Sequence, residues 1–181
     1  MAWEVDASEF ETATDAGSKT PKAGTYHVTI TDYDDTMDKV ESIIVRFEVL
    51  DGTVPGQAGK EHTEFFRTES KKEGEAGAKA TKWLRDRIAT LGMAAGVVKP
   101  GSKATLSDEN MVGTDLVIRL EDNEYTAKDG TKKQNVRIPF SEMWPTDHAE
   151  VADVPKNEAF RAGKRPADDV PFETDDEFGD I

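Results

Sequence analysis

The chain has 181 residues with 37 acidic and 23 basic side chains, which give a formal net charge of -14. This length fits one domain with appendages, and a hydrophobic fraction of 36% beside 33% charged residues fits a compact core diluted by polar segments. The absence of cysteine excludes disulfides, thiolate metal sites and cysteine nucleophiles. The acidity argues against a protein that clamps duplex phosphates with its whole surface, but it leaves room for a local basic groove.

Nothing in the sequence indicates a membrane segment. No apolar run approaches the roughly 18 residues of a membrane span, and the first residues lack the basic and apolar stretches of a signal peptide. The lack of cysteine is compatible with a reducing compartment. We therefore expect a soluble cytoplasmic protein with no membrane partner.

Alternating hydrophobicity predicts three strands in the first part of the chain. A strand begins at Gly24, and after an acidic turn the alternation resumes over residues 42–50. A third strand, 60–68, contains the adjacent aromatic residues Phe65 and Phe66. Because successive side chains of a strand point to opposite faces, one of these two must face outward.

Apolar residues at helical spacing predict one helix, which should end at Gly92 or Gly96. Its apolar stripe comprises Ala80, Trp83, Leu84, Ile88 and Leu91. We therefore expect Trp83 to lie in the core.

The pattern returns to strands after a connector that contains a short helical turn begun by Ser107. Two further strands, 116–121 and 136–140, alternate in the same way as the first three. Between them, Asp129-Gly130 is a strong hairpin signal.

The predicted order is strand, strand, strand, helix, strand, strand. This is the order of the OB-fold, a partly open Greek-key barrel that binds oligonucleotides and oligosaccharides. We therefore expect a mainly β fold with one helix, an OB-fold-like five-stranded barrel over residues 24–144. An irregular N-terminal arm, 1–23, precedes it, and a flexible linker, 145–167, follows it, because prolines recur there and no hydrophobic period survives.

An acidic tail, residues 168–181, ends the sequence with seven carboxylates, two phenylalanines and no basic side chain. Such a segment cannot bury enough apolar surface to fold alone, so we expect it to be disordered. Aromatic anchors among carboxylates are typical of a peptide that docks on basic, apolar-lined pockets of other proteins.

An OB-like body, a linker and a carboxylate-rich tail with Val170-Pro171-Phe172 resemble the single-stranded DNA-binding proteins of bacteria and their phages, whose tails carry aspartates followed by Ile-Pro-Phe. More narrowly, residues 1–144 resemble a phage family described only as a domain of unknown function, often encoded near replication and recombination genes. The matching stretches are Ala23-Gly24-Thr25-Tyr26, Val45-Arg46-Phe47-Glu48-Val49-Leu50 and Leu91-Gly92-Met93-Ala94-Ala95-Gly96-Val97. The resemblance implies a protein that coats single-stranded DNA without strong sequence preference during phage replication, recombination or repair, in the host cytoplasm.

The resemblance also implies that the tail recruits polymerase, helicase or recombinase. In the bacterial proteins the Pro-Phe pair ends the chain, whereas here nine residues follow Phe172. Two anchors therefore stay open, Phe172 and Phe178. The first segment comprises Asp168, Asp169, Val170, Pro171 and Phe172, and the second comprises Asp175, Asp176, Glu177 and Phe178. The pattern is compatible with a monomer or a homo-oligomer.

Single-strand binding needs cations for the backbone and aromatic faces for the bases. If the apolar sets of the strands face the core, three arginines share the outer surface, and the hairpin adds three lysines for which its tip has no structural need. The expected nucleic-acid-binding residues are Arg46, Phe65, Phe66, Arg67, Arg119, Tyr125, Lys128, Lys132, Lys133, Arg137 and Trp144. Tyr33, in the acidic turn, is a further outward aromatic candidate, although the carboxylates of that turn should repel phosphate.

The sequence does not indicate an enzyme. The three histidines lack metal-ligand spacing, and the Gly-Pro-rich stretch 52–59 lacks the Lys-Ser ending of a phosphate-binding loop. The acidic turn lacks the glycine and the final glutamate of a calcium loop. We therefore expect no catalytic residue, no metal and no cofactor.

Two other function classes stay open. The first is an acidic interaction or inhibitor protein that mimics the charge of DNA and binds a host factor without touching nucleic acid. Removing the seven acids of the tail leaves 30 acids against 23 bases, a charge of -7 that supports this alternative. The second is a structural phage protein with an OB-like domain.

Overall fold

The computed structural model describes residues 19–38 and 40–163. Residues 1–18 of the predicted arm, residues 164–167 of the predicted linker and the whole acidic tail lie outside the described residues. The strands are β1 (Gly24–Asp34), β2 (Ser42–Gly52), β3 (Glu61–Arg67), β4 (Asp115–Thr126), β5 (Lys132–Arg137) and β6 (Met143–Trp144). The helices are α2 (Gly74–Ala94), α3 (Asp108–Met111), α4 (Glu158–Gly163) and the 3-10 turn η1 (Ala149–Val151).

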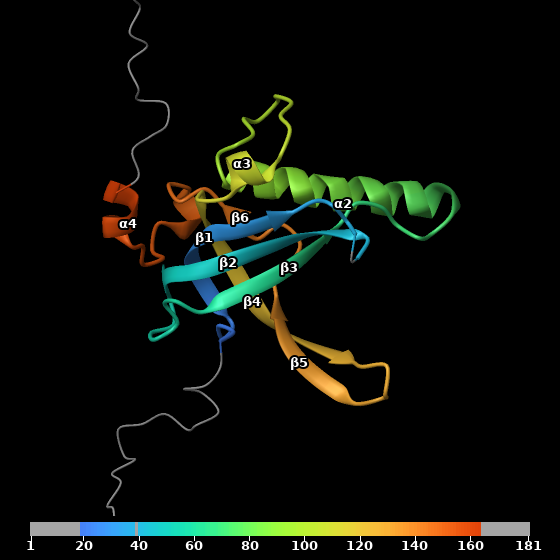
Figure 1. Cartoon of the computed structure of the whole chain (residues 1–181), viewed down its shortest axis with the longest axis horizontal. Helices are drawn as coiled ribbons and strands as arrows, with labels where there is room; N and C mark the ends of the chain where they lie inside the picture. Colours follow the sequence, from blue (N-terminus) through green and yellow to red (C-terminus); the bar gives the residue numbers. More distant parts are fainter. Residues whose placement is uncertain (1–18, 39, 164–181) are drawn as a thin grey trace, which may run out of the picture.

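The strands form an open antiparallel sheet in the order β3-β2-β1-β4-β5, with β6 paired to β4. Its two edges are β3 and β5, and no ladder joins these edges in the described part of the chain. Figure 1 shows the long helix α2 along one side of the sheet and the β4–β5 hairpin projecting away from β3. The fold is therefore mainly β, as predicted, with α2 between the third and fourth strands.

The core lies on the inner face of the sheet. Alternate residues of the strands supply it, as the sequence period predicts, and Leu91 of α2 and Met111 of α3 pack against them. The core strand residues include Tyr26, Val28, Ile30, Val45, Phe47, Leu116 and Ile118. Phe66 is 1% exposed and its neighbour Phe65 is 50% exposed, so the expected division of this pair between two faces is confirmed.

Helix α2 ends near Gly96, one of the two predicted stops. Its last residue is Ala94, and Gly96 adopts a φ of 77°, the left-handed region in which glycine is favoured. The Gly96 N–H donates to the carbonyl of Met93, and the Val97 N–H donates to the carbonyl of Gly92. These bonds satisfy terminal carbonyls that would otherwise lack a partner.

The C-terminal strap, which we define as residues 145–163, corrects the linker prediction. Instead of hanging free, it packs on the outer face of the sheet, where Val151 and Val154 cover Val117. The Asn157 N–H donates to Nδ1 of the fully buried His27 at 3.1 Å. Scattered apolar residues without a period are enough here, because Val117 gives β4 a second apolar face. The middle of β1 and the first half of β4 are therefore buried on both sides.

A buried arginine joins the two edges of the sheet. Arg87 of α2 donates from Nε to the carbonyl of Phe140 at 3.2 Å and from Nη2 to the carbonyl of Ile138 at 3.0 Å. From Nη1 it donates to the carbonyl of Phe65 on β3 at 3.5 Å. Its guanidinium also lies over the Phe66 ring at 4.5 Å. These bonds connect β3 to the chain just after β5, where backbone pairing is missing.

Glu64 of β3 completes this connection. Its Oε2 accepts from the backbone N–H of Ile138 at 2.9 Å and pairs with His62 Nε2 at 2.8 Å, and its Oε1 lies 3.4 Å from Arg87. Burial alone would raise the pKa of Glu64, but the bonds from His62 and Ile138 and the charge of Arg87 together lower it. Glu64 is therefore held as a carboxylate between the two edges.

Removing the guanidinium should destabilise the fold strongly. We expect Arg87→Met to lower the free energy of unfolding by about 3 kcal/mol, because it leaves the buried Glu64 carboxylate without its cation. The control is Arg85→Met on the exposed face of α2, which breaks only the exposed ion pair to Glu69 and should cost less than about 1 kcal/mol. Urea unfolding followed by circular dichroism measures both, and equal losses would contradict the bridging role of Arg87.

The lowered pKa of Glu64 gives a defined pH dependence. A carboxylate whose pKa is lowered by folding stabilises the protein above its unfolded pKa of about 4.3, and this contribution is lost as the pH falls through the folded pKa. The stability difference between wild type and Glu64→Gln should therefore be largest above about pH 5 and shrink below about pH 4. Urea unfolding of both proteins across this range tests the sign, and a difference that grows towards acid pH would contradict it.

Candidate nucleic-acid interface

A groove of about 430 Å³ lies between β3, α2 and the chain at the end of β5. We call it the edge groove, since it runs along the seam between the two edges of the sheet that Arg87 connects. Its lining residues are Glu64, Phe65, Arg67, Trp83, Leu84, Arg87, Glu121, Arg137, Ile138, Pro139 and Phe140. The groove thus combines aromatic rings, arginines and carboxylates from four separate parts of the chain.

Exposed aromatic rings form the first component of the edge groove. The Trp83 side chain, predicted to lie in the core, is 51% exposed and stacks on Phe140 with ring centroids 3.7 Å apart and planes 14° from parallel. Phe65 adds a second exposed ring from β3. Large exposed aromatic faces beside one another are the type of surface on which unpaired nucleobases stack.

The sequence did not predict the exposure of Trp83, because the helical period does not show what lies opposite each residue. The apolar stripe of α2 is interrupted by Arg87, four residues after Trp83 and four before Leu91. An arginine in the middle of an apolar stripe was the available signal that this part of the helix faces polar groups. Phe140 was expected only as a strand residue, and β5 ends before it at Arg137.

Arginines form the second component of the edge groove. Arg67 is exposed at the end of β3, and within the described residues no ion pair restrains it. Arg137 of β5 is 56% exposed at its side chain and donates from Nε to Glu121 Oε1 at 3.0 Å. Both were predicted to contact nucleic acid, and both lie beside Phe65 and Trp83 in the groove.

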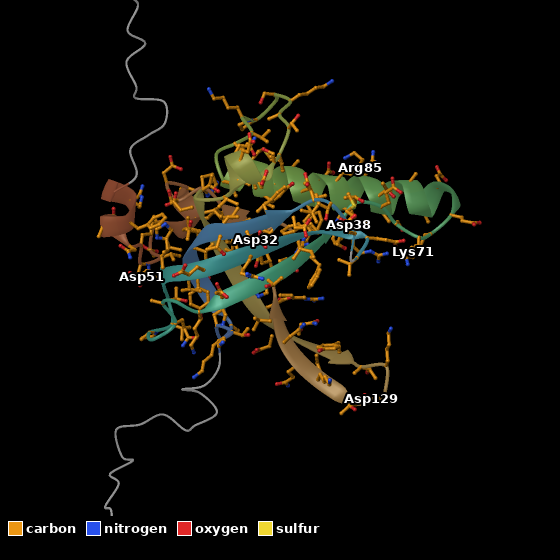
Figure 2. All side chains as sticks on the ribbon, in the orientation of Figure 1. Asp32, Asp38, Asp51, Lys71, Arg85 and Asp129 are labelled. Atoms are coloured by element: carbon orange, nitrogen blue, oxygen red, sulfur yellow. The ribbon has the colours of Figure 1, made fainter. Side chains whose placement is uncertain are left out.

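The β4–β5 hairpin extends the face of the edge groove outward. Cross-strand pairs place Glu121 opposite Arg137 and Tyr125 opposite Lys133, and strand alternation puts all four on one face. Lys132 is paired with Thr126 and therefore points to the other face. Figure 2 shows the tip of this hairpin, marked by Asp129, standing clear of the rest of the sheet. The lysine cluster of the sequence analysis is thus divided between two faces.

The remaining predicted residues are placed elsewhere. Phe66 is a core residue and cannot offer a ring to a ligand. Trp144 packs with the C-terminal strap and donates from Nε1 to Glu150 at 3.0 Å. Arg119 is held by Glu142, whose hydrogen bond raises the pKa of the arginine. None of these three lines the edge groove.

Two other cations keep the exposure that was expected of them. Arg46 is exposed on β2, on the face that also carries Thr63 and Phe65 of β3. Lys128 is exposed in the hairpin turn. Neither residue lines the edge groove.

Tyr33 does not serve as the outward aromatic residue expected in the acidic turn. It belongs to β1, is 5% exposed and packs in the core. Burial, with a contribution from the charge of Asp35, raises the pKa of Tyr33 to about 12. The acidic turn therefore presents carboxylates without an aromatic face.

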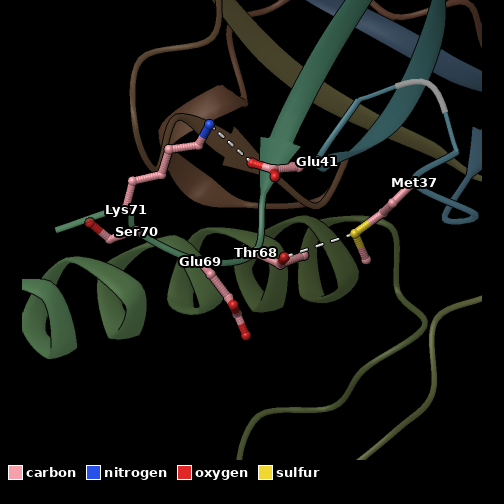
Figure 3. Close-up of a pocket in the computed structure, with 6 residues that line it drawn as sticks. All are labelled: Met37, Glu41, Thr68, Glu69, Ser70 and Lys71. Carbon is pink, nitrogen blue, oxygen red and sulfur yellow. Dashed lines mark hydrogen bonds and ion pairs between the residues drawn. The ribbon is translucent and has the colours of Figure 1, made fainter. Parts of the chain in front are cut away.

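A second hollow, of about 700 Å³, lies beside that turn (Figure 3). Thr68 donates to the sulfur of Met37 at 3.9 Å, and Lys71 pairs with Glu41 at 3.3 Å. Both members of this ion pair are largely exposed, and the hollow has no aromatic lining. Among the described residues that line it, none offers an aromatic ring and the one cation is paired, so the edge groove is the stronger candidate site.

Comparison with known proteins gives no family for this chain: no protein-family model and no curated protein matches it. In residues 19–38 and 40–163, no group of three or more histidine, aspartate or glutamate side chains is arranged to hold a metal ion. None of the helices in that same portion is both long and apolar enough to cross a membrane. The edge groove therefore has to be interpreted from its own chemistry.

The exposure of Trp83 can be tested against its predicted place in the core. We expect Trp83→Ala to lower the free energy of unfolding by about 1 kcal/mol, because it removes one exposed aromatic stack. The matched change Leu91→Ala on the same helix should cost about 3 kcal/mol, because Leu91 is fully buried. Urea unfolding followed by circular dichroism compares the two losses of stability. Equal losses would indicate that Trp83 is buried in the core.

Proposed function

We propose that this protein binds single-stranded DNA through the edge groove. The observation that carries the proposal is the convergence of the Trp83–Phe140 stack, Phe65, Arg67 and Arg137 in one groove. Stacking on aromatic rings contributes about 1 to 3 kcal/mol per base and accepts any base, while cations follow the phosphates. The bases of a duplex cannot stack on these rings, because they are already stacked on one another.

The strand order supports an OB-like architecture. The order β3-β2-β1-β4-β5, with a helix between β3 and β4, is what an OB barrel would show if β3 and β5 approached each other. Here Arg87 and Glu64 connect β3 to the chain just after β5 with side-chain bonds. We propose that they take the place of the missing ladder and close an OB-like barrel.

The biological setting of the proposal rests on the resemblance to bacterial and phage single-strand binding proteins. In that setting the protein coats strands exposed in phage replication, recombination or repair, and it has no catalytic role. The acidic tail then recruits replication or recombination enzymes, with Phe172 or Phe178 as its anchor. The position of the strap supports separate places for DNA binding and partner recruitment, since the strap ends in α4, at the end of the molecule away from the β4–β5 hairpin (Figure 1).

The formal charge of -14 favours one alternative, an acidic protein that binds a host factor and does not touch DNA. This alternative gives no reason for exposed aromatic rings to gather beside arginines. A titration with oligo(dT) of about thirty nucleotides, followed by quenching of the intrinsic fluorescence to which Trp3, Trp83 and Trp144 all contribute, separates the two functions. Saturable and salt-sensitive quenching supports single-strand binding, whereas its absence supports the alternative.

Two adjacent lysines of the hairpin provide a matched test of the face that binds. Lys133→Ala should weaken oligo(dT) binding and reduce the slope of log affinity against log salt by about 0.7, the loss of one phosphate contact on a single strand. Lys132→Ala removes the same charge from the opposite face and should change the slope much less. If Lys132→Ala has the larger effect, the strand does not run along the face of Tyr125 and Arg137.

A further inference from the structure

The edge groove contains two carboxylates besides its arginines and rings, and they differ in their free hydrogen-bonding capacity. Glu64 is occupied by His62, by the N–H of Ile138 and by Arg87. Glu121 is partly exposed, and in the part of the chain that the structure describes only its Oε1 accepts a close hydrogen bond, from Arg137. A groove that bound phosphates alone would gain nothing from this second carboxylate.

The position of Glu121 leaves one oxygen available to a ligand. Arg119 Nη2 lies 4.0 Å from Oε2, which is beyond hydrogen-bonding distance. Arg119 is itself engaged by Glu142. Glu121 therefore presents a carboxylate with spare acceptor capacity, directly beside the partly exposed guanidinium of Arg137.

We propose that Glu121 gives the edge groove a preference for guanine among the bases that it stacks. This inference rests on the proposed function. A carboxylate accepts from groups that donate, and the Watson–Crick edge of guanine carries two adjacent donors, N1–H and the N2 amine. One of them can bond to Oε2, and the other to the second lone pair of Oε1, whose first accepts from Arg137. Next to these donors lies O6, an acceptor for the guanidinium of Arg137.

The other bases match this pair of side chains less well. Cytosine and adenine each offer one amine to the carboxylate. Thymine has a single N3–H between two carbonyl oxygens, and the second carbonyl repels the carboxylate. Guanine should therefore rank first and thymine last, on top of the stacking that all bases share.

The test isolates the N2 amine by comparing guanine with inosine, whose base differs from guanine only by the lack of that amine. Three strands of thirty nucleotides, in which every second thymine of oligo(dT) is replaced by guanine, replaced by inosine or kept, compete with a labelled oligo(dT) for the full-length protein, so that most binding registers place the varied base in the groove. We expect the guanine strand to bind about fivefold more tightly than the inosine strand, toward the lower end of bidentate base discrimination because Glu121 is partly exposed to water.

Glu121→Gln should move affinity and selectivity in opposite directions. Overall affinity should stay level or rise, because a negative charge leaves a site that binds a polyanion, while the ratio of guanine to inosine affinity falls towards one. The control is Glu124→Gln, which removes the same charge from the opposite face of the hairpin and should keep the ratio. A merely structural or electrostatic role of Glu121 would change all three affinities together.

Each outcome decides between the two proposals. Equal affinities for guanine and inosine strands, or a ratio that Glu121→Gln leaves unchanged, would overturn the guanine preference and leave single-strand binding intact. No saturable binding of any of the three strands would overturn the proposed function and the preference with it. The inosine comparison in the wild-type protein decides the question even if Glu121→Gln fails to fold.

Discussion

One guanidinium group links the architecture of this protein to its candidate site. Arg87 reaches from α2 into the seam between β3 and β5 and donates to carbonyls on both sides of it. The same bonds fix the chain around Phe140, the ring on which Trp83 stacks. A buried charge is tolerated there because Glu64, three carbonyls and the Phe66 ring surround it. The bonds of Arg87 that hold the seam of the sheet together thus also hold residues that line the edge groove.

The outer surface of the sheet is divided between two uses. Over β1 and β4 it is covered by the C-terminal strap, which buries His27 and Val117. Over β2 and β3, no segment among residues 19–38 and 40–163 covers it in the same way, and there Arg46 and Phe65 are exposed. The strap therefore leaves the half of the sheet that adjoins the edge groove free for a ligand.

The proposed binding of a polyanion by so acidic a protein requires that its cations are gathered locally. In the edge groove the arginines lie beside aromatic rings, and Glu121 restrains Arg137. Carboxylates at such a site lower the electrostatic attraction for phosphate, so binding has to depend more on bases than on charge. That balance favours unpaired strands over duplex, because a duplex offers mainly its phosphates to such a surface.

Local signals in the sequence were enough to predict β1 to β4, the Asp129-Gly130 hairpin, the turn at Ser107 and the opposite directions of Phe65 and Phe66, since each depends on a few neighbouring residues. The fifth strand was predicted over 136–140, but it lies earlier, over Lys132–Arg137. The tertiary structure decided the exposure of Trp83, the burial of Arg87, the docking of the strap and the separation of Lys132 from the face of Lys133. A helical period shows which residues share a face but not what packs against it, and scattered apolar residues show no period at all. Those features depend on which distant segments meet, and the edge groove exists only because β3, α2 and the end of β5 meet at Arg87.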